Sequence, residues 1–510
     1  MEILAFVIYF VAMLGIGVFF FIKSKADAGE KEYFLGGRQM GPWVTAMSAQ
    51  ASDMSAWLLM GLPGSIVAFG LGQAWIGIGL AIGTALNWII VGKRLRNFSA
   101  AANDSITVPQ YLSNRFASKN PALQIVCAVI FLVFFTIYVA SSFVAGVTVF
   151  QSVFPQIGSD TALLIFAAII IVYTFLGGYK AVCWTDFFQG IMILVALLAV
   201  PIVVVCTKDL GAEEYTANMR ELINNIDPEN IQKFPFAKSL FSASWQDIVS
   251  GLAWGLGYFG MPHILVRFMS IKKASMVKKS AIVAVVWVVI ALGATIFVAY
   301  FGRMLIGDEL LVNGAPRQQM VFIELSRMFF PGIIAGFLLS AIIAASMSTA
   351  DSQLLVSSAS FTSDIYKPVF RKNASEKETL WIGRIVVLVI SVIAFFIARS
   401  EGEGAQAIMS LVDNAWAGFG AAFGPVILLS LFWKRFTYSG AIAGIISGGA
   451  AVVACIAFDF QGKTGIYEII PGFIICFIFA IIVTLISKKP SAEATAIFEK
   501  ATAPGYGEDD

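Results

Sequence analysis

Residues 49–64 read AQASDMSAWLLMGLPG, and this stretch decides how the chain folds. It lies in an apolar segment long enough to cross a bilayer. Yet it contains the carboxylate of Asp53, the hydroxyls of Ser52 and Ser55, and a Gly-Leu-Pro-Gly helix breaker at 61–64. Such groups are costly in hydrocarbon, where no water can satisfy them. The stretch therefore predicts a broken membrane helix that faces a protein interior or a watery cavity.

The composition is that of a polytopic membrane protein. Of the 510 residues, 58% are hydrophobic and 13% are charged, and the mean hydropathy is +0.83. Soluble chains are about one quarter charged. The first apolar run is expected to be a span and not a secretory signal, because Glu2 stands where a signal has a basic region. We expect a multi-pass protein of the cell (cytoplasmic) membrane.

The residues that would support enzymatic chemistry are scarce. The five cysteines lack metal-ligand spacing, and His263 is the only histidine, which argues against a Ser-His-Asp triad or a histidine metal site. The sequence thus predicts neither an enzyme nor an organic cofactor, and it shows no signal for nucleic-acid binding.

Windows of about 20 apolar residues predict an all-α protein with thirteen transmembrane helices. They lie near 3–22, 41–71, 73–92, 122–152, 160–179, 182–206, 246–270, 280–302, 331–362, 380–398, 405–433, 438–457 and 466–487. Most of the 34 Lys and Arg residues follow odd-numbered spans, among them Lys93, Arg94 and Arg267. The positive-inside rule then places the N-terminus outside and the C-terminus in the cytoplasm.

A second broken helix is predicted five spans after the first. Span 7 reads AWGLGYFGMPHILVRF, with Gly255, Gly257, Gly260 and Pro262 close together. Gly/Pro-broken segments at matching positions indicate inverted repeats in secondary transporters; the alternative is that Gly and Pro are simply common in membrane helices. The predicted parts are an N-terminal span with its cytoplasmic loop, a first repeat of spans 2–6, an extracellular loop, a second repeat of spans 7–11, two C-terminal spans and a cytoplasmic tail. Their bounds are 1–40, 41–206, 207–245, 246–435, 436–489 and 490–510.

Polar groups in two spans suggest a cation site. The first break frees backbone carbonyls between Ala51 and Met54, and carbonyls with hydroxyls suit a monovalent ion such as sodium. In span 9 (SAIIAASMSTADSQLLVSSAS, 340–360), Ser348, Asp351 and Ser352 lie at i, i+3 and i+4 on one helical face. The alternative is a buried aspartate satisfied by helix packing.

Two further features bear on the site. Asp186, at the start of span 6, is interpreted equally as a helix N-terminal charge or a cation ligand. Four aromatic residues lie in mid-span near the breaks and predict a pocket for a small solute: Trp57, Tyr138, Trp254 and Tyr258. Helix N-termini suit a carboxylate and carbonyls suit an ammonium, so the pattern favours an amino acid over a sugar.

These motifs make the chain resemble the sodium/solute symporter family, and within it the sodium/proline symporter branch. The resemblance rests on YFLGGRQMGPW (33–43), SAQASDMSAWLLMGLPG (48–64), FFTIY (134–138), WTDFFQ (184–189), WGLGYFGMPHILVRF (254–268) and MSTADSQLLVSS (347–358). It implies a five-plus-five inverted-repeat fold with broken first helices, like that of amino-acid/sodium symporters. It also implies alternating access, with inward sodium flow driving L-proline uptake.

The resemblance also implies roles for individual residues. Sodium would be bound by the carbonyls of Ala51, Met54 and Ala345 and the hydroxyls of Ser348 and Thr349. Asp53 and Ser55 match positions linked to sodium coupling, and the four aromatic residues match the substrate pocket. Asp186 matches a carboxylate that helps to bind a second sodium in some relatives, with partners in the turn of Asp351 and Ser352. Asp351 is a departure, because other members have a hydroxyl there, and this leaves the sodium stoichiometry open.

Three alternatives to proline symport are carried forward. The same mechanism could move another compact solute, such as a different amino acid or pantothenate. A transporter-like sensor is disfavoured because only about 20 residues follow Lys489, too few for a signalling domain. A membrane enzyme lacks a nucleophile–base pair. The expected partners are the small-molecule substrate and membrane lipid, with the protein functional as a monomer.

Overall fold

The computed structural model describes residues 1–24, 29–176, 178–210, 239–311, 317–401 and 405–508. Every regular element in these ranges is a helix, apart from one isolated bridge between Met40 and Ile271. Residues 211–238 of the expected extracellular loop lie outside the described ranges. The prediction of an all-α protein is confirmed for the part of the chain that the structure describes.

The first broken helix is present at the stretch 49–64. Helix α3 (Pro42–Met54) begins with a proline in its first turn and ends at Ser55, whose φ of 46° turns the backbone out of the helix. A short 3₁₀ turn, η2 (Ala56–Leu58), and then α4 (Gly61–Phe69) continue the segment. The positive φ at a serine marks a constrained turn in the middle of the segment.

The second broken helix has the same sequence of elements. Helix α13 (Trp245–Ala253) passes into the 3₁₀ segment η6 (Trp254–Phe259), and α14 (Pro262–Ser270) follows at a bend of 45°. Pro262 opens α14 at a position where its missing N–H costs nothing. Both predicted breaks therefore exist, each with a 3₁₀ turn between two shorter helices.

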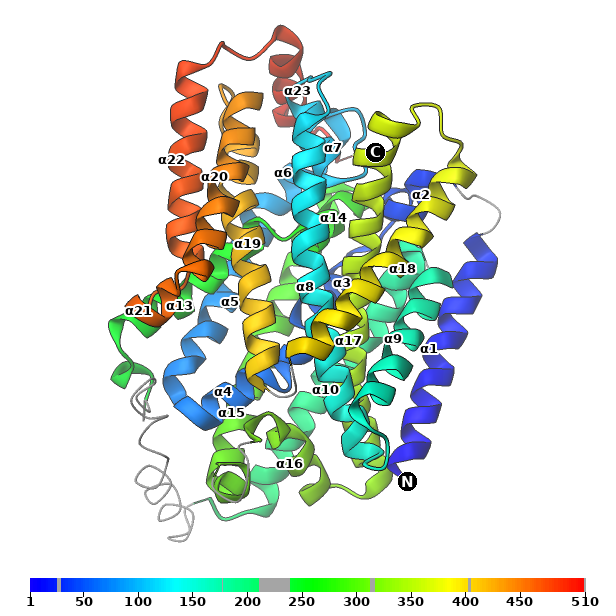
Figure 1. Cartoon of the computed structure of the whole chain (residues 1–510), viewed down its shortest axis with the longest axis vertical. Coiled ribbons are helices and arrows are strands. Elements are labelled where there is room, and N and C mark those ends of the chain that lie inside the picture. The colour runs from blue at the N-terminus through cyan, green and yellow to red at the C-terminus, as the bar shows by residue number, and fades with distance from the viewer. Residues whose placement is uncertain (25–28, 177, 211–238, 312–316, 402–404, 509–510) are drawn as a thin grey trace.

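The remaining long helices run along the length of the molecule (Figure 1). They are α1 (Glu2–Ser24), α5 (Ala74–Leu86) continued by the π-helical η4 (Asn87–Gly92) and α6 (Lys93–Ala101), α8 (Ala122–Val153), α9 (Ser159–Leu176), α10 (Tyr179–Thr207), α15 (Val277–Leu311), α17 (Gly332–Ser360) continued by η9 (Phe361–Phe370), α18 (Glu376–Glu401), α19 (Ala405–Phe432), α20 (Tyr438–Ala457) and α22 (Ile469–Ile486). Shorter helices connect them: α2 (Glu30–Leu35), η1 (Gly36–Arg38), η3 (Leu71–Gln73), α7 (Val108–Arg115), η5 (Leu240–Ser242), η7 (Ala274–Met276), η8 (Gln318–Met320), α16 (Val321–Phe329), α21 (Phe460–Thr464) and α23 (Ala492–Thr502).

Ten helices in the described ranges are long and apolar enough to cross a membrane, or eleven when the bent pair of α13 and α14 is counted as one span. Helices occupy all thirteen predicted windows. The pieces of the first broken helix and the helix α9 do not pass the same test of length and composition. The chain is a multi-pass membrane protein, and the count of thirteen spans stays a prediction.

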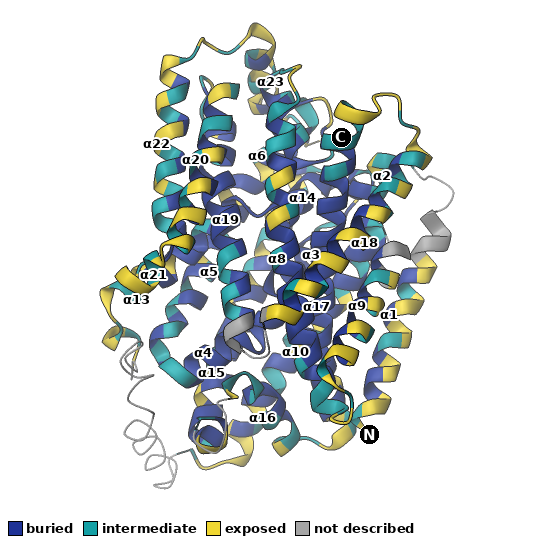
Figure 2. Ribbon diagram, viewed as in Figure 1, coloured by how far each residue is buried: buried dark blue, intermediate teal, exposed yellow. Residues whose placement is uncertain are grey.

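The helices form a buried centre and a lipid-facing periphery (Figure 2). The most apolar windows of α17 and α19 are 83% and 89% buried, against 28% for α1 and α22. Helix α17 packs against α3, α8 and α10, so the first break and span 9 meet in the centre. The outer helices expose apolar side chains such as Val11, Val389 and Ile482, as a surface in contact with lipid should.

Candidate functional site

The end of α3 meets the middle of α17 at one buried point. The Ser348 hydroxyl donates to the Ala51 carbonyl at 2.8 Å and lies 3.2 Å from the Ala345 carbonyl of its own helix. The last four carbonyls of any helix have no partner within it, and Ala51–Met54 are those residues in α3. The first break therefore offers backbone oxygens to groups on α17.

The neighbouring Thr349 completes this set of oxygens. It is fully buried, and its hydroxyl has no hydrogen-bond partner within the described ranges. Carbonyls with two hydroxyls and no carboxylate form a donor set suited to a monovalent hard cation. No group of three or more His, Cys, Asp or Glu residues that could hold a metal ion occurs in the described part of the chain. Of the five predicted sodium ligands, Ser348 contacts the carbonyls of both Ala51 and Ala345 through its hydroxyl. Thr349 adjoins Ser348 in the chain, and Met54 is the residue at which α3 ends.

Asp53 and Ser55 are organised by the break itself. The Tyr258 hydroxyl, from the second broken helix, donates to Asp53 Oδ2 at 2.5 Å, and the Tyr138 hydroxyl lies 3.4 Å from the Asp53 carbonyl oxygen. The Ser55 hydroxyl accepts from the Trp57 backbone N–H at 3.1 Å and so caps η2. The Asp53 carboxylate therefore contacts the second break, and a hydrogen bond joins the two broken helices.

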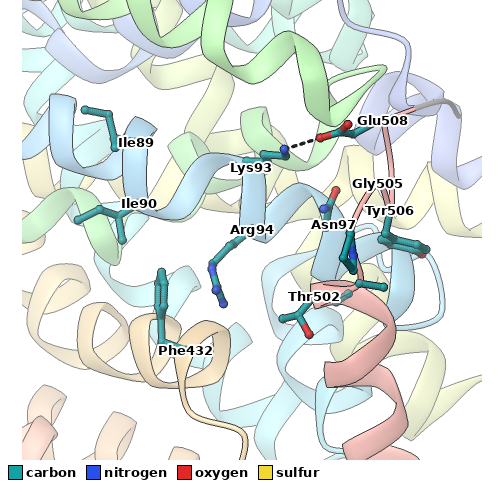
Figure 3. A pocket seen from close by; sticks show the side chains of 13 residues that line it. Ile89, Ile90, Lys93, Arg94, Asn97, Phe432, Thr502, Gly505, Tyr506 and Glu508 are labelled. Carbon is teal, nitrogen blue, oxygen red and sulfur yellow. Dashed lines mark hydrogen bonds and ion pairs between the residues drawn. The ribbon is translucent and has the colours of Figure 1, made fainter.

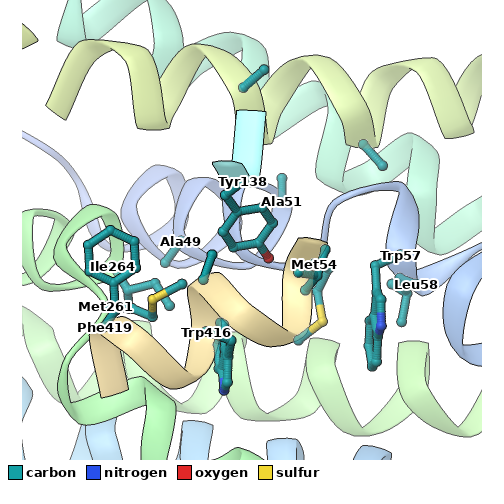
Figure 4. Packing of buried hydrophobic residues seen from close by; sticks show 14 of the residues in the cluster. Ala49, Ala51, Met54, Trp57, Leu58, Tyr138, Met261, Ile264, Trp416 and Phe419 are labelled. Carbon is teal, nitrogen blue, oxygen red and sulfur yellow. The ribbon is translucent and has the colours of Figure 1, made fainter. Parts of the chain in front are cut away.

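The four predicted pocket aromatics come together beside the first break. The rings of Trp57 and Trp254 stack with centroids 5.4 Å apart, while Tyr138 and Tyr258 both reach Asp53. All four side chains are buried. Figure 4 shows Trp57, Met54 and Tyr138 around the end of α3, with Trp416 on the neighbouring α19. The arrangement is an apolar, aromatic environment next to the backbone carbonyls at the end of α3.

Two aromatic residues of this cluster were not predicted. Trp416 donates its indole N–H to the Trp254 carbonyl at 2.8 Å, and Tyr467 stacks on Trp254 with centroids 5.3 Å apart. Trp416 lies in α19, shortly after Asp413 and Asn414. These two polar residues inside a span were the available sequence signal that this part of α19 faces the site. Nothing in the sequence near Tyr467 points to the site.

A buried charge cluster lies one helical turn from the proposed sodium ligands. Asp186 Oδ2 accepts from the Ser48 hydroxyl at 2.7 Å and from Arg267 Nη2 at 3.2 Å. The same guanidinium nitrogen lies 2.5 Å from the Ser352 hydroxyl. Ser48 precedes Ala51 by one turn on α3, and Ser352 follows Ser348 by one turn on α17. The cluster thus joins α3, α10, α14 and α17.

Two interpretations of the sequence are wrong at this cluster. Arg267 was assigned to a loop by the alternation of basic residues, but it is 1% exposed inside α14. Asp186 does not lie in the first turn of its helix, because α10 begins at Tyr179. It is paired with Arg267 instead.

Asp351 is the unusual member of this region. It is fully buried on α17, and neither of its carboxylate oxygens has a hydrogen-bond partner in the part of the chain that the structure describes. Asp186 Oδ1 also lacks one within those ranges. Unpaired carboxylate oxygens in a membrane interior are costly, so these oxygens can accept a proton or a cation.

Two discontinuous helices that meet at buried oxygens are typical of secondary transporters. The model of the sodium:solute symporter family matches residues 33–448. A sodium/proline symporter of Escherichia coli (strain K12) is 41% identical over 503 residues, covering 98% of this chain and 96% of the relative. One of Haemophilus influenzae is 43% identical over 512 residues, covering 98% and 97%. The chain belongs to the sodium:solute symporter family, as its motifs predicted, and is a transport protein and not an enzyme.

A solved structure supports the fold. A substrate-bound, outward-open Na+-coupled sialic acid symporter matches with a TM-score of 0.74 over 96% of this chain and 98% of that one. The two sequences are 19% identical. The overall helix arrangement is therefore shared with a sodium-coupled symporter.

Proposed function

We propose that the chain is a secondary active transporter that couples inward sodium flow to uptake of L-proline by alternating access. The observation that carries the proposal is the contact of the Ser348 hydroxyl with the freed Ala51 carbonyl, beside the unpaired Thr349 hydroxyl. The choice of proline is supported by the names of the two relatives, which align over nearly the whole chain.

Sodium, the transported ion, is proposed to bind between α3 and α17. Its ligands are the carbonyls of Ala51, Met54 and Ala345 and the hydroxyls of Ser348 and Thr349. Bound sodium would replace the Ser348–Ala51 hydrogen bond with two oxygen–ion contacts. The ion would then hold the end of α3 and the middle of α17 together. Asp53 and Ser55 hold the turn from which these carbonyls project, and this is the role in coupling that we assign to them.

Proline is proposed to bind beside that ion, against Trp57, Tyr138, Trp254 and Tyr258. The stacked indoles offer an apolar surface to the pyrrolidine ring. Because Tyr258 also donates to Asp53, a solute that contacts this tyrosine would act on the turn that binds sodium. The hydrogen bond between Tyr258 and Asp53 therefore connects the proposed proline pocket to the proposed ion site.

A second cation is proposed to bind at Asp186, Asp351 and Ser352. The Arg267 guanidinium already lies on Asp186 Oδ2 and the Ser352 hydroxyl. A second ion would accordingly use Asp186 Oδ1 and the Asp351 carboxylate, the oxygens without hydrogen-bond partners in the described ranges. Replacing Asp351 with serine should then reduce the steepness of the sodium dependence of proline binding, and an unchanged curve would remove Asp351 from the site.

The proposed topology has thirteen spans with the N-terminus outside and the C-terminus in the cytoplasm. The division into 1–40, 41–206, 207–245, 246–435, 436–489 and 490–510 follows, with spans 2–6 and 7–11 as inverted repeats. Two broken helices at the start of the proposed repeats support it. The two ends of the chain lie toward opposite ends of the molecule in Figure 1, in accord with an odd number of crossings. The transporter is proposed to work as a monomer without an organic cofactor.

The experiment is uptake of radiolabelled proline into proteoliposomes that contain the purified chain. We expect accumulation with an inward sodium gradient and none when choline replaces sodium. Accumulation without sodium would contradict the coupling. Competition by unlabelled amino acids and pantothenate identifies the solute: if another compound displaces proline at far lower concentration, the mechanism stands and the substrate changes. Sodium-dependent binding without any transport would favour the sensor.

A further inference from the structure

A cavity of about 480 Å³ lies at the membrane end of the span formed by α5, η4 and α6, under the C-terminal segment. Its walls come from η4 and α6, from the last residue of α19 and from residues 501–508 (Figure 3). None of its lining residues lies on α3 or α17, which carry the proposed sodium ligands, and no role described above uses it.

The cavity has an apolar side and a cationic side on the same helix. Ile89 and Ile90 are followed four residues later by Lys93 and Arg94, so each isoleucine shares a helical face with a basic residue. Ile89 is 70% exposed and continues a stripe with Ile82 and Leu86 along the outer face of the span. A phospholipid has the same arrangement, with apolar acyl chains joined to a charged headgroup.

Arg94 is held in position but keeps hydrogen-bonding capacity. Its Nη1 donates to the Leu431 carbonyl at 2.7 Å, and the guanidinium lies 4.2 Å from the centroid of the Phe432 ring. The hydrogen bonds found in the described ranges use only Nη1. In Figure 3 the side chain extends into the space between Phe432 and Thr502. Its remaining donors are therefore available for an anion, which a planar guanidinium binds well.

The C-terminal segment places a carboxylate against the same cationic side. Glu508 accepts from Lys93 at 2.6 Å, and the Gly507 carbonyl accepts from the Ala274 N–H at 2.9 Å. Gly507 has a φ of 76°, a backbone conformation that favours glycine, and a Cβ added there would lie 2.5 Å from Asn97 Oδ1. The chain thus already supplies an anion to this site from its own end.

We propose that this cavity, defined by Ile89, Ile90, Lys93, Arg94 and Phe432, binds an anionic phospholipid of the cytoplasmic leaflet in competition with Glu508. The headgroup phosphate contacts Arg94 and Lys93, and the acyl chains lie on Ile89, Ile90 and the exposed stripe of α5. A soluble phosphate would not use the exposed isoleucines. The proposal rests on the proposed function only for the orientation that makes this the cytoplasmic side.

Lipid binding to the purified chain tests the proposal. The delipidated protein in detergent is titrated with phosphatidylglycerol or phosphatidylcholine of identical acyl chains. Native mass spectrometry counts bound lipid, and thermal unfolding measures stabilisation. We expect phosphatidylglycerol to bind more tightly. Each basic residue near an anionic surface contributes roughly fivefold to affinity. Replacing both Lys93 and Arg94 with alanine should therefore weaken phosphatidylglycerol binding by roughly 25-fold.

Two further variants keep the result interpretable. Lys278→Ala removes an exposed lysine on α15 outside the cavity and should leave the affinity unchanged. Glu508→Gln removes the competing carboxylate without touching a span, and it should strengthen phosphatidylglycerol binding.

The outcomes separate the possible ligands. Equal affinity for the two lipids, or an equal loss in Lys278→Ala, would overturn the proposal. Equal protection by glycerophosphoglycerol or inorganic phosphate would overturn the lipid in favour of a soluble anion. Because the readout is lipid binding and not uptake, failure of proline transport would leave this result unaffected.

Discussion

Arg267 Nη2 lies 3.2 Å from Asp186 Oδ2, and the two side chains are 1% and 0% exposed. The ion pair joins the second broken helix to α10, and Ser48 and Ser352 add α3 and α17 to the same group. In the proposed orientation α3 enters from the cytoplasm and α17 runs toward it. The pair then lies one turn to the cytoplasmic side of the sodium ligands, on the route by which the ion must leave.

Removing one partner of this pair should cost more than removing both. Arg267→Met leaves Asp186 as an uncompensated buried charge, and such changes cost about 3–5 kcal/mol. The double variant Arg267→Met and Asp186→Leu replaces both charges with apolar side chains and should recover much of that loss. Thermal unfolding of the wild type, Arg267→Met, Asp186→Leu and the double variant, each in detergent, gives the coupling energy between the two side chains. Additive losses would show that the 3.2 Å contact contributes no pairwise stabilisation.

Ser348→Ala should weaken sodium binding more than an equivalent change elsewhere on α17. The variant removes a hydroxyl that contacts the Ala51 carbonyl. One lost oxygen ligand corresponds to about a tenfold higher sodium concentration for half-maximal proline binding. Thr349→Ala should have a similar effect. Ser346→Ala is the matched control, because its hydroxyl only bonds back to the Ile342 carbonyl at 3.1 Å. Equal shifts in Ser346→Ala and Ser348→Ala would contradict the site.

Tyr258→Phe should impair sodium-dependent binding through Asp53. The phenol donates to Asp53 Oδ2 at 2.5 Å, and its loss leaves that buried carboxylate without its donor. We expect a several-fold rise in the sodium concentration needed for proline binding. Asp53→Asn, whose amide oxygen still accepts from Tyr258, should be milder than Asp53→Ala. Tyr111→Phe removes another buried tyrosine hydroxyl, 2.8 Å from Ser430, and serves as the control. Identical behaviour of the two tyrosine variants would argue against a role for Asp53 in coupling.

The breaks in the fold could be predicted because their causes are local. Pro262 and the glycines around it disrupt a helix wherever they occur, and a carboxylate such as Asp53 is excluded from lipid by solvation alone. The i, i+3, i+4 spacing on α17 likewise placed Ser348 and Ser352 on one face. The pairing of Ser348 with Ala51, however, joins residues 297 positions apart, and only the family resemblance suggested it.

What the sequence analysis missed depended on packing between distant helices. Arg267 comes at the end of an apolar run, where the positive-inside rule treats a basic residue as part of a loop. Its burial reflects the packing of α14 against α3 and α17 and its contacts with Asp186 and Ser352, which no rule of composition supplies. One signal was available: Asp186 in a span needs a partner, and few basic residues lie within apolar segments. Tyr467 offered no such signal, because a tyrosine near a membrane end is ordinary.

The contact between the second broken helix and α5 depends on glycine. Gly79 and Gly83 face Gly251 and Gly255, and a Cβ added at Gly255 would lie 2.5 Å from the Gly79 carbonyl oxygen. This four-residue spacing of small residues lets two helices touch backbone to backbone. Gly83→Ala should cost roughly 1–3 kcal/mol by overpacking and should displace η6, which holds Trp254 and Tyr258. Gly293→Ala is the control, because no atom lies within 4 Å of its added Cβ; there the better helix propensity should add about 0.5–1 kcal/mol. Thermal unfolding and proline binding measured on both variants test this prediction: a Gly83→Ala protein with unchanged stability and unchanged proline affinity would contradict the proposed close contact between α5 and η6.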